Sequence, residues 1–404
     1  MSAIVLVIRR TVGTRLDRRK SPSPRPFALP RDILNLFYSD DDGGDPDRWI
    51  KFDRYPRAVI RRIVRGPRRI MGMERMFLNL IAGLDRLGIP YRLNDYAHLS
   101  RHPGEVAGVV GKPPILDKIP RETPIVFGPA GYNHPIDAPT LFTDHHVLGV
   151  LVPCEWERQM FAVHWHDKVH IWPVGIDTDA WAPAAGAVKD IDVLVYNKIR
   201  FHPARDTAAV LEPVLETLRT SGRRIASLAY GHYRETEFRA LLKRSRSMVF
   251  LCEHETQGIA LQQTLSSDVP VYAWDAGGPW RDADYYPARV NFGPVTSVPY
   301  WDDRCGSKFI DAAGFRTGFP SFWSRVIDGS FSPRHFILDN LTLETGARGY
   351  VDLVERLSAG INGASSARPI ERQRLAVKAL EREAEETSNG RSDIDEKGGA
   401  ARRP

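Results

Sequence analysis

The residues best suited to chemistry lie in one short stretch, 248–273, which reads MVFLCEHETQGIALQQTLSSDVPVYA. Its pattern predicts an apolar strand, a polar turn that carries Glu255, a helix from Gly258, and a second strand after a Ser-Ser-Asp-Val-Pro break. In an open parallel sheet, ligands bind beyond the carboxyl ends of the strands. Free N–H groups at the helix start, at Gly258 and Ile259, favour an anion such as phosphate. The stretch therefore predicts an anion-binding site beside a carboxylate.

The helix expected after Gly258 has two distinct faces. Gln263 follows Ile259 by about one turn, so these two side chains share a face. Leu261 and Leu265 share another face, which can be buried against the sheet. We expect the face with Gln263 to look into the crevice that holds the anion.

The elements that must position these residues form two similar series. A chain of 404 residues is too long for one ordinary core, which predicts two domains with appendages. Strands alternate with helices in both series, and this alternation predicts an α/β protein with two Rossmann-like parallel-sheet domains facing each other across a cleft. Strands are expected at 32–40, 91–93, 106–110, 125–127 and 147–152, then at 190–197, 224–230, 248–251 and 269–273; helical periodicity returns near 307–327 and at 341–358.

The expected domain boundaries follow changes in composition along the chain. They are a mobile lead-in over 1–31, an N-terminal Rossmann-like domain over 32–183, a C-terminal Rossmann-like domain over 184–335, a helix over 336–360 that packs back toward the first domain, and a disordered tail over 361–404.

Composition argues against several classes of protein. No window approaches the roughly 18–20 apolar residues that a membrane-spanning helix needs. Cys154, Cys252 and Cys305 have no metal-ligand spacing, which fits reduced thiols in a cytosolic protein. The Asp-rich turn at 40–47 contains D-x-D strings, but it follows the first strand of a two-Rossmann chain, which favours a solvated loop. No metal site is expected.

The net charge of +6 is unevenly distributed, because residues 54–75 hold many arginines among aliphatic side chains and almost no acid. Such a segment suits an anionic surface: lipid headgroups, a phosphorylated acceptor or nucleic acid. The alternative is a solvated basic loop or helix. Nucleic acid is not expected as a partner, since no recognition module accompanies the charge.

Four collinear segments resemble the retaining nucleotide-sugar glycosyltransferases of glycosyltransferase family 4, which have the GT-B fold. The segment E-T-Q-G-I-A-L-Q-Q-T-L-S-S-D-V-P-V resembles the family pattern E-G-F-G-L-x-x-x-E-A-x-A-x-G-x-P-V from Glu255 onward. MGMER at 71–75 is similar to the G-G-x-E-R loop of the family, VPCEWERQMF at 152–161 to its V-x-S-x-W segment, and VHIWPVGIDTDAWAP at 169–183 to its V-x-x-I-P-N-G-V-D-x-x-x-F-x-P segment. The resemblance covers roughly residues 70–360.

The resemblance implies a role for individual residues. Glu255 would contact hydroxyls of the transferred sugar, and Gln263 stands where the family has a glutamate that holds the ribose hydroxyls. Glutamine can still accept a hydrogen bond but loses its charge-assisted part, at a cost on the order of 1 kcal/mol. The remaining candidates are Gly72, Lys198, Arg200, Gly258 and Ile259 around the diphosphate, and His134, which would orient the acceptor hydroxyl or contact the donor sugar.

The expected function is transfer of a sugar from a nucleotide-sugar such as a UDP- or GDP-sugar to a glycan, lipid-linked or other hydroxyl acceptor, in cell-surface polysaccharide or glycoconjugate synthesis. The resemblance implies retention of configuration, with no metal and no cofactor. The expected location is the cytoplasm, including the inner face of the membrane through residues 54–75.

Two alternatives remain open. One is a non-catalytic sugar- or nucleotide-binding protein on the same scaffold, because Gln263 replaces a glutamate. The other is a nucleotide- or dinucleotide-dependent enzyme with different chemistry, which is disfavoured because no G-x-G-x-x-G follows the strand at 190–197 or at 32–39.

Overall fold

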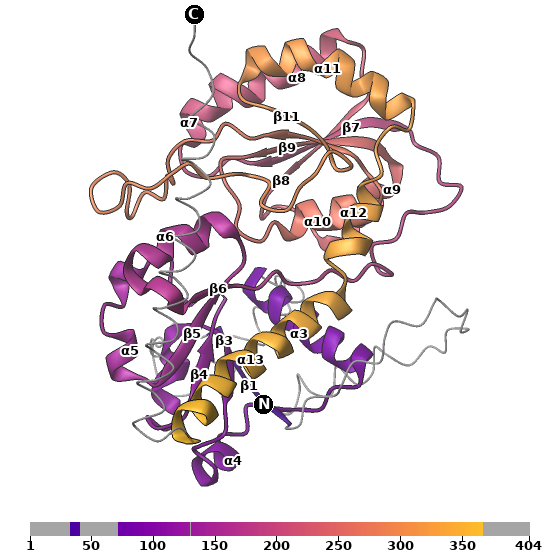
Figure 1. The fold of residues 1–404 in the computed structure, drawn as a ribbon. Helices are drawn as coiled ribbons and strands as arrows, with labels where there is room; N and C mark the ends of the chain where they lie inside the picture. The colour runs from indigo at the N-terminus through magenta and orange to yellow at the C-terminus, as the bar shows by residue number, and fades with distance from the viewer. Residues whose placement is uncertain (1–32, 41–71, 130, 367–404) are drawn as a thin grey trace, which may run out of the picture. The chain divides into compact units, whose positions relative to one another are not determined.

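The computed structural model of the chain describes residues 33–40, 72–129 and 131–366 (Figure 1). Several predictions from the sequence lie wholly or partly outside these residues: the lead-in over 1–31, the Asp-rich turn beyond Asp40, the basic segment as far as residue 71, and the tail from residue 367.

The first part of the described chain is built around a six-stranded, all-parallel sheet in the order β2-β1-β3-β4-β5-β6. Parallel strands are covered on both faces, and β3 is accordingly buried along its whole length. The strands are β1 (Leu34–Ser39), β2 (Tyr91–Leu93), β3 (Ala107–Gly111), β4 (Ile125–Phe127), β5 (Val147–Val152) and β6 (Val169–Ile171). The helices are α3 (Gly72–Leu87), α4 (Tyr96–Arg101), α5 (Leu141–Asp144) and α6 (Glu155–Trp165), with 3₁₀ turns at Pro113–Lys118, Pro135–Asp137 and His166–Lys168.

The second part is built around a five-stranded, all-parallel sheet in the order β11-β10-β9-β7-β8. The two sheets confirm the predicted class of an α/β protein with two parallel-sheet units. The strands are β7 (Ile191–Lys198), β8 (Ile225–Ala229), β9 (Ser245–Cys252), β10 (Val271–Trp274) and β11 (Gly306–Phe309). The helical segments are α7 (Pro203–Asp206), a π-helical stretch at Thr207–Leu211, α8 (Glu212–Thr220), α9 (Glu235–Arg244), α10 (Ile259–Ser266), α11 (Ala312–Ile327), α12 (Pro333–Asn340) and α13 (Leu343–Ser366).

The order of the second sheet reverses between β7 and β9. From β7 the chain continues to β8 on one side, and it then crosses to β9, β10 and β11 on the other side. Connections from the two strands therefore diverge and leave a crevice beyond their carboxyl ends, which is where open α/β sheets bind ligands. Lys198, the last residue of β7, is in register with Cys252, the last residue of β9. The loops after these two strands are therefore neighbours.

The helix predicted near 307–327 begins later than the sequence suggests, because its first residues form the edge strand β11. Gly306 pairs with Val271 of β10, and an added Cβ on Gly306 would lie 1.9 Å from the carbonyl oxygen of Val271. Helical structure starts only at Ala312, after Asp311, whose side chain accepts a hydrogen bond from the Gly314 N–H. Phe309 fits either an apolar strand or an apolar helix face, so periodicity alone could not separate the two.

The last described helix, α13, packs against α3 of the first sheet (Figure 1). The contact is close because Gly83 has no side chain: an added Cβ there would lie 2.8 Å from the Cβ of Ala347. Further along α13, Tyr350 is fully buried, with its ring 4.8 Å from that of Trp172. In the described part of the chain, no helix combines the length and apolar character that crossing a membrane requires.

Candidate active site

The crevice between β7 and β9 holds an ion pair between Lys198 and Glu255. The Nζ of Lys198 donates a hydrogen bond to Oε2 of Glu255, and the two side chains are only 11% and 14% exposed. Burial alone lowers the pKa of the Lys198 ammonium, but attraction to Glu255 and the hydrogen bond between them outweigh it and raise the pKa. The structure thus brings into direct contact two predicted site residues that are 57 positions apart in the sequence. The raised pKa keeps Lys198 cationic.

The backbone of Glu255 is fixed from two directions. Its N–H donates to the carbonyl oxygen of Thr296 at 3.0 Å, and its carbonyl oxygen accepts from Nε1 of Trp156 at 2.9 Å. Trp156 belongs to α6, beside the first sheet, whereas Thr296 lies between β10 and β11. The backbone that carries this carboxylate is therefore held by hydrogen bonds whose partners come from both halves of the described chain.

Gly258 turns the chain from this carboxylate into α10. It has a left-handed backbone, with φ of 67°, and an added Cβ would lie 3.2 Å from Cγ of Glu255. Both features favour glycine at this position. The helix that begins at Ile259 has no side-chain cap on its first N–H groups. Its positive dipole end therefore lies close to the pair of Lys198 and Glu255, as an anion site requires.

Arg200 lies just beyond Lys198 in the loop after β7. Oε1 of Glu253 accepts the backbone N–H groups of Arg200 at 2.8 Å and of Phe201 at 2.9 Å, which fixes the course of this loop. The guanidinium of Arg200 lies 5.6 Å from the ring centre of Tyr230, and Nζ of Lys198 lies 4.6 Å from the same ring. Both predicted cations therefore share one aromatic platform at the end of β8.

Three residues of this cluster, Glu253, His254 and Tyr230, were not identified from the sequence. Glu253 and His254 adjoin Glu255 within the predicted turn, so proximity to it was the available signal. Tyr230 ends the predicted strand at 224–230, and only the order of the sheet shows that β8 lies next to β7.

Gln263 lines a cavity of about 150 Å³. It is only 6% exposed, and its side-chain amide makes no hydrogen bond within the described part of the chain. An ion pair between Arg75 of α3 and Glu235 of α9 also lines this cavity. The remaining lining residues are Leu78, Asn79, Ala82, Ile176, Asp177, Ala180, Trp181, Arg239 and Leu343.

The neighbouring Gln262 provides a contrast on the same helix. Its Nε2 donates to the carbonyl oxygen of Gln257 at 2.7 Å, and its Oε1 accepts from Nε2 of Gln257 at 3.1 Å. Gln257 in turn bonds both the N–H and the carbonyl oxygen of Val174, each at 3.1 Å. Gln262 therefore has its hydrogen bonds satisfied by the protein, whereas the amide of Gln263 does not.

The two remaining candidates, Gly72 and His134, make none of the contacts described above. Gly72 is the first residue of α3, and no atom of the described residues lies within 4 Å of an added Cβ, so their packing does not require glycine there. His134 caps a 3₁₀ turn by accepting the Ile136 N–H at 3.2 Å, and its ring stacks on Trp280 at 5.8 Å. His134 is 2% exposed, and burial lowers its pKa to about 4. Its predicted role toward an acceptor remains a prediction.

The arrangement defines a class of site: an α/β sheet whose switch point carries a buried lysine–carboxylate pair, a further arginine and an uncapped helix start. Fixed cations and backbone N–H groups of this kind stabilise negative charge on a phosphate without reorganising. The adjacent carboxylate can accept hydrogen bonds from hydroxyl groups.

No family model and no curated protein sequence matches the chain. Solved structures with a similar fold include a glycosyltransferase involved in avilamycin A biosynthesis, 14% identical over 81% of this chain and 98% of that one, with a TM-score of 0.48. A second is a glycosyltransferase involved in lipopolysaccharide biosynthesis, 11% identical over 80% of this chain and 99% of that one, with a TM-score of 0.44. A third is sucrose-phosphate synthase from Thermosynechococcus elongatus, 10% identical over 81% of this chain and 100% of that one, with a TM-score of 0.48. These likenesses leave the substrates of this chain undetermined.

Proposed function

We propose that the protein is a glycosyltransferase that moves a sugar from a nucleotide-sugar, such as a UDP- or GDP-sugar, to a hydroxyl of a glycan or lipid-linked acceptor. The observation that carries the proposal is the contact between Lys198 and Glu255 at the switch point of the second sheet, next to the start of α10. A sugar diphosphate needs both features at once: cationic and N–H groups for the diphosphate, and a hydrogen-bond acceptor for the sugar hydroxyls.

Each residue has a defined part in this proposal. Lys198 and Arg200, with the N–H groups at the start of α10, stabilise the charge that develops on the leaving diphosphate. Glu255 accepts hydrogen bonds from hydroxyls of the transferred sugar, and Gln263 accepts from the ribose. The new bond forms on the face from which the diphosphate leaves, so configuration is retained, and the acceptor proton passes to the leaving phosphate. The proposed chemistry uses neither a metal nor a cofactor.

A donor screen tests the proposal directly. Common UDP- and GDP-sugars are added to the purified full-length protein, and thermal shift reports binding because a ligand of the folded state raises the melting temperature. Donors that bind are then assayed for hydrolysis and for transfer to glycan and lipid-linked acceptors. Binding with turnover supports the proposal. Binding without turnover supports the alternative of a non-catalytic binding protein, and no binding to any donor overturns both.

We further propose that the protein works in the cytoplasm at an anionic membrane surface, in the synthesis of a cell-surface polysaccharide or glycoconjugate. This proposal rests on the sequence of the basic segment 54–75, most of which lies outside the described residues. Neutralising Arg61, Arg62, Arg68 and Arg69 together should weaken sedimentation with anionic lipid vesicles. Equal sedimentation of the variant and the unchanged protein would remove the membrane proposal and leave the glycosyltransferase proposal intact.

A further inference from the structure

His254 lies in the loop between β9 and α10, directly before Glu255, and two aromatic rings hold its side chain. The ring of Phe201 stacks on the imidazole with centroids 4.5 Å apart and an interplanar angle of 22°. The ring of Trp156 meets it edge-on at 5.7 Å and 74°. These neighbours come from the loop after β7 and from α6. The plane of the imidazole is therefore set by packing from two separate elements.

The outer nitrogen of this ring has no protein partner. Nε2 of His254 is buried and makes no hydrogen bond to any group of the described residues. A buried polar atom without a partner is uncommon in a folded protein, and such atoms are found at functional sites. Burial, followed by repulsion from Lys198, Arg200 and Arg281, lowers the pKa of His254 to about 3. The imidazole is therefore neutral, and three cations surround it.

Most carboxylate oxygens near this cluster already have a protein partner. Glu255 pairs with Lys198, and Oε1 of Glu253 accepts two backbone N–H groups, whereas its Oε2 makes no hydrogen bond to the described residues. Arg281 lies 3.9 Å from Asp206. Across the part of the chain that the structure describes, Arg200 forms no ion pair with a carboxylate.

Helix α6, which carries Trp156, also supplies no negative charge that would offset the three cations around His254. On α6, Glu155 is exposed and pairs with Arg158 at 2.6 Å. Burial raises the pKa of Glu157 to about 8, so this carboxyl is predominantly protonated at neutral pH. Arg200 and Tyr230 are exposed, so the positively charged side of the cluster is open to solvent.

We propose that His254 is a further residue of the donor site, which donates an Nε2–H hydrogen bond to the diphosphate of the bound nucleotide-sugar and takes up a proton when that anion binds. This inference rests on the proposed function. An anion beside the ring offsets the repulsion from the three cations and stabilises the imidazolium form. Because the bound state then holds one more proton than the free state, the affinity for the donor increases as the pH falls.

His254 forms no covalent bond in this scheme. The bond between the sugar and the diphosphate oxygen breaks, and its electron pair stays on that oxygen. The acceptor oxygen forms the new bond to the sugar, and its proton passes to the leaving phosphate. The imidazolium of His254 stabilises the charge on the diphosphate as this charge develops.

Calorimetric titration tests the inference without turnover. UDP-glucose, UDP-N-acetylglucosamine and GDP-mannose serve as probes in the absence of an acceptor, because the diphosphate of a nucleotide-sugar has no group that titrates near neutral pH. Titrations at pH 6 and pH 8, each in two buffers with different ionisation enthalpies, give the number of protons taken up. We expect uptake at pH 6, less at pH 8, and tighter binding at pH 6.

His254→Gln should abolish the proton uptake and weaken binding at pH 6 about tenfold, the size of one hydrogen bond to a charged group. His232→Gln is the matched control, since His232 is an exposed histidine in the loop after β8 of the same sheet; its uptake and affinity should equal those of the unchanged protein. If His254→Gln does not fold, the imidazole nitrogen signals of the unchanged protein should show one ring becoming protonated when the probe is added.

The possible failures are distinguishable. A probe that binds without proton uptake, or with the same uptake in His254→Gln, overturns the role of His254 and leaves the proposed function standing. Failure of every probe to bind overturns both.

Discussion

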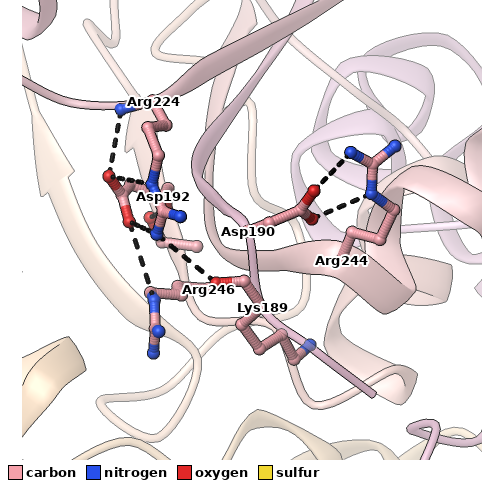
Figure 2. Close-up of polar contacts among 7 residues, drawn as sticks. Lys189, Asp190, Asp192, Arg224, Arg244 and Arg246 are labelled. Atoms are coloured by element: carbon pink, nitrogen blue, oxygen red, sulfur yellow. Dashed lines mark hydrogen bonds and ion pairs between the residues drawn. The ribbon is translucent and has the colours of Figure 1, made fainter.

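The carboxylates at the two ends of the second sheet have different kinds of partner. At the amino ends of the strands, Asp192 accepts from the backbone N–H, Nε and Nη2 of Arg224 at 3.0, 3.2 and 2.8 Å, and Asp190 accepts from Nε and Nη2 of Arg244 at 2.8 and 2.6 Å (Figure 2). Arg246 lies 3.6 Å from Asp192 on the other side. Each carboxylate there has an arginine partner within the protein.

At the carboxyl ends, by contrast, two buried polar atoms lack hydrogen-bond partners among the described residues. They are Oε2 of Glu253 and Nε2 of His254. A satisfied network contributes to stability, whereas an unsatisfied group costs free energy that a ligand can recover. We therefore expect stability to depend more on the amino end of this sheet and function more on its carboxyl end, and substitutions should separate the two.

The largest effect is expected from Glu255→Gln at the carboxyl end. The glutamine has nearly the same shape and can still accept from Lys198, but it leaves the buried ammonium without its counter-charge, so the melting temperature should also fall. The loss of the carboxylate weakens hydrogen bonds to the sugar and alters the charge beside the diphosphate, so kcat/KM should fall about 100-fold or more. Steady-state kinetics with a donor found by the screen, together with a thermal melt, measures both effects. Activity that is unchanged would remove Glu255 from the catalytic site.

The opposite result is expected from Asp192→Asn at the amino end. Three hydrogen bonds from Arg224 reach the two oxygens of Asp192, and asparagine keeps only one accepting oxygen and no charge. The free energy of unfolding should therefore fall by about 1–2 kcal/mol, while kcat/KM of the folded protein is unchanged. Asp190→Asn is the control, because the pair between Asp190 and Arg244 is about half exposed on both sides and should matter less. Chemical denaturation measures the difference. A loss of activity without a loss of stability would reverse the assignment of the two ends.

The pH dependence of that difference has a defined sign. Hydrogen bonds from Arg224 lower the pKa of Asp192, although burial partly opposes them. A carboxyl whose pKa is lower in the folded than in the unfolded state contributes stability that is complete above its unfolded pKa, about 3.9, and is lost as the pH falls through the folded value. The stability difference between the unchanged protein and Asp192→Asn should therefore be constant near neutral pH and shrink below about pH 4.

How far the sequence predicts the fold differs between regions. Continuous apolar runs gave every strand of the first sheet from β1 to β5 within about two residues, because fully buried parallel strands have a strong signal. The edge strand β11 was missed, since its four residues include the two consecutive polar residues Ser307 and Lys308, which weaken that signal.

The candidate site was predictable only in part, for a related reason. Local spacing identifies Glu255 and the start of α10 because they lie on one supersecondary unit. The clamp of Phe201 and Trp156 around His254 joins residues distant in sequence, and such contacts depend on strand order and on how the two sheets approach each other. A single sequence carries no direct signal for them. The same limit applies to His134, whose ring contacts Trp280, 146 residues further along the chain.

The smallest effect is expected at Gln263, and it gives the most specific test of the comparison. Gln263→Glu places a carboxylate in the cavity beside Arg75 and Arg239, where it can accept hydrogen bonds from ribose hydroxyls with charge assistance. Binding of a nucleotide-sugar should tighten by about fivefold, corresponding to roughly 1 kcal/mol, with little change in melting temperature. Gln262→Glu is the matched control one residue away. It cannot donate to the carbonyl oxygen of Gln257, so it should destabilise the protein without tightening donor binding. If both variants lower stability and neither changes affinity, Gln263 is a structural residue like its neighbour, and the ribose must bind elsewhere.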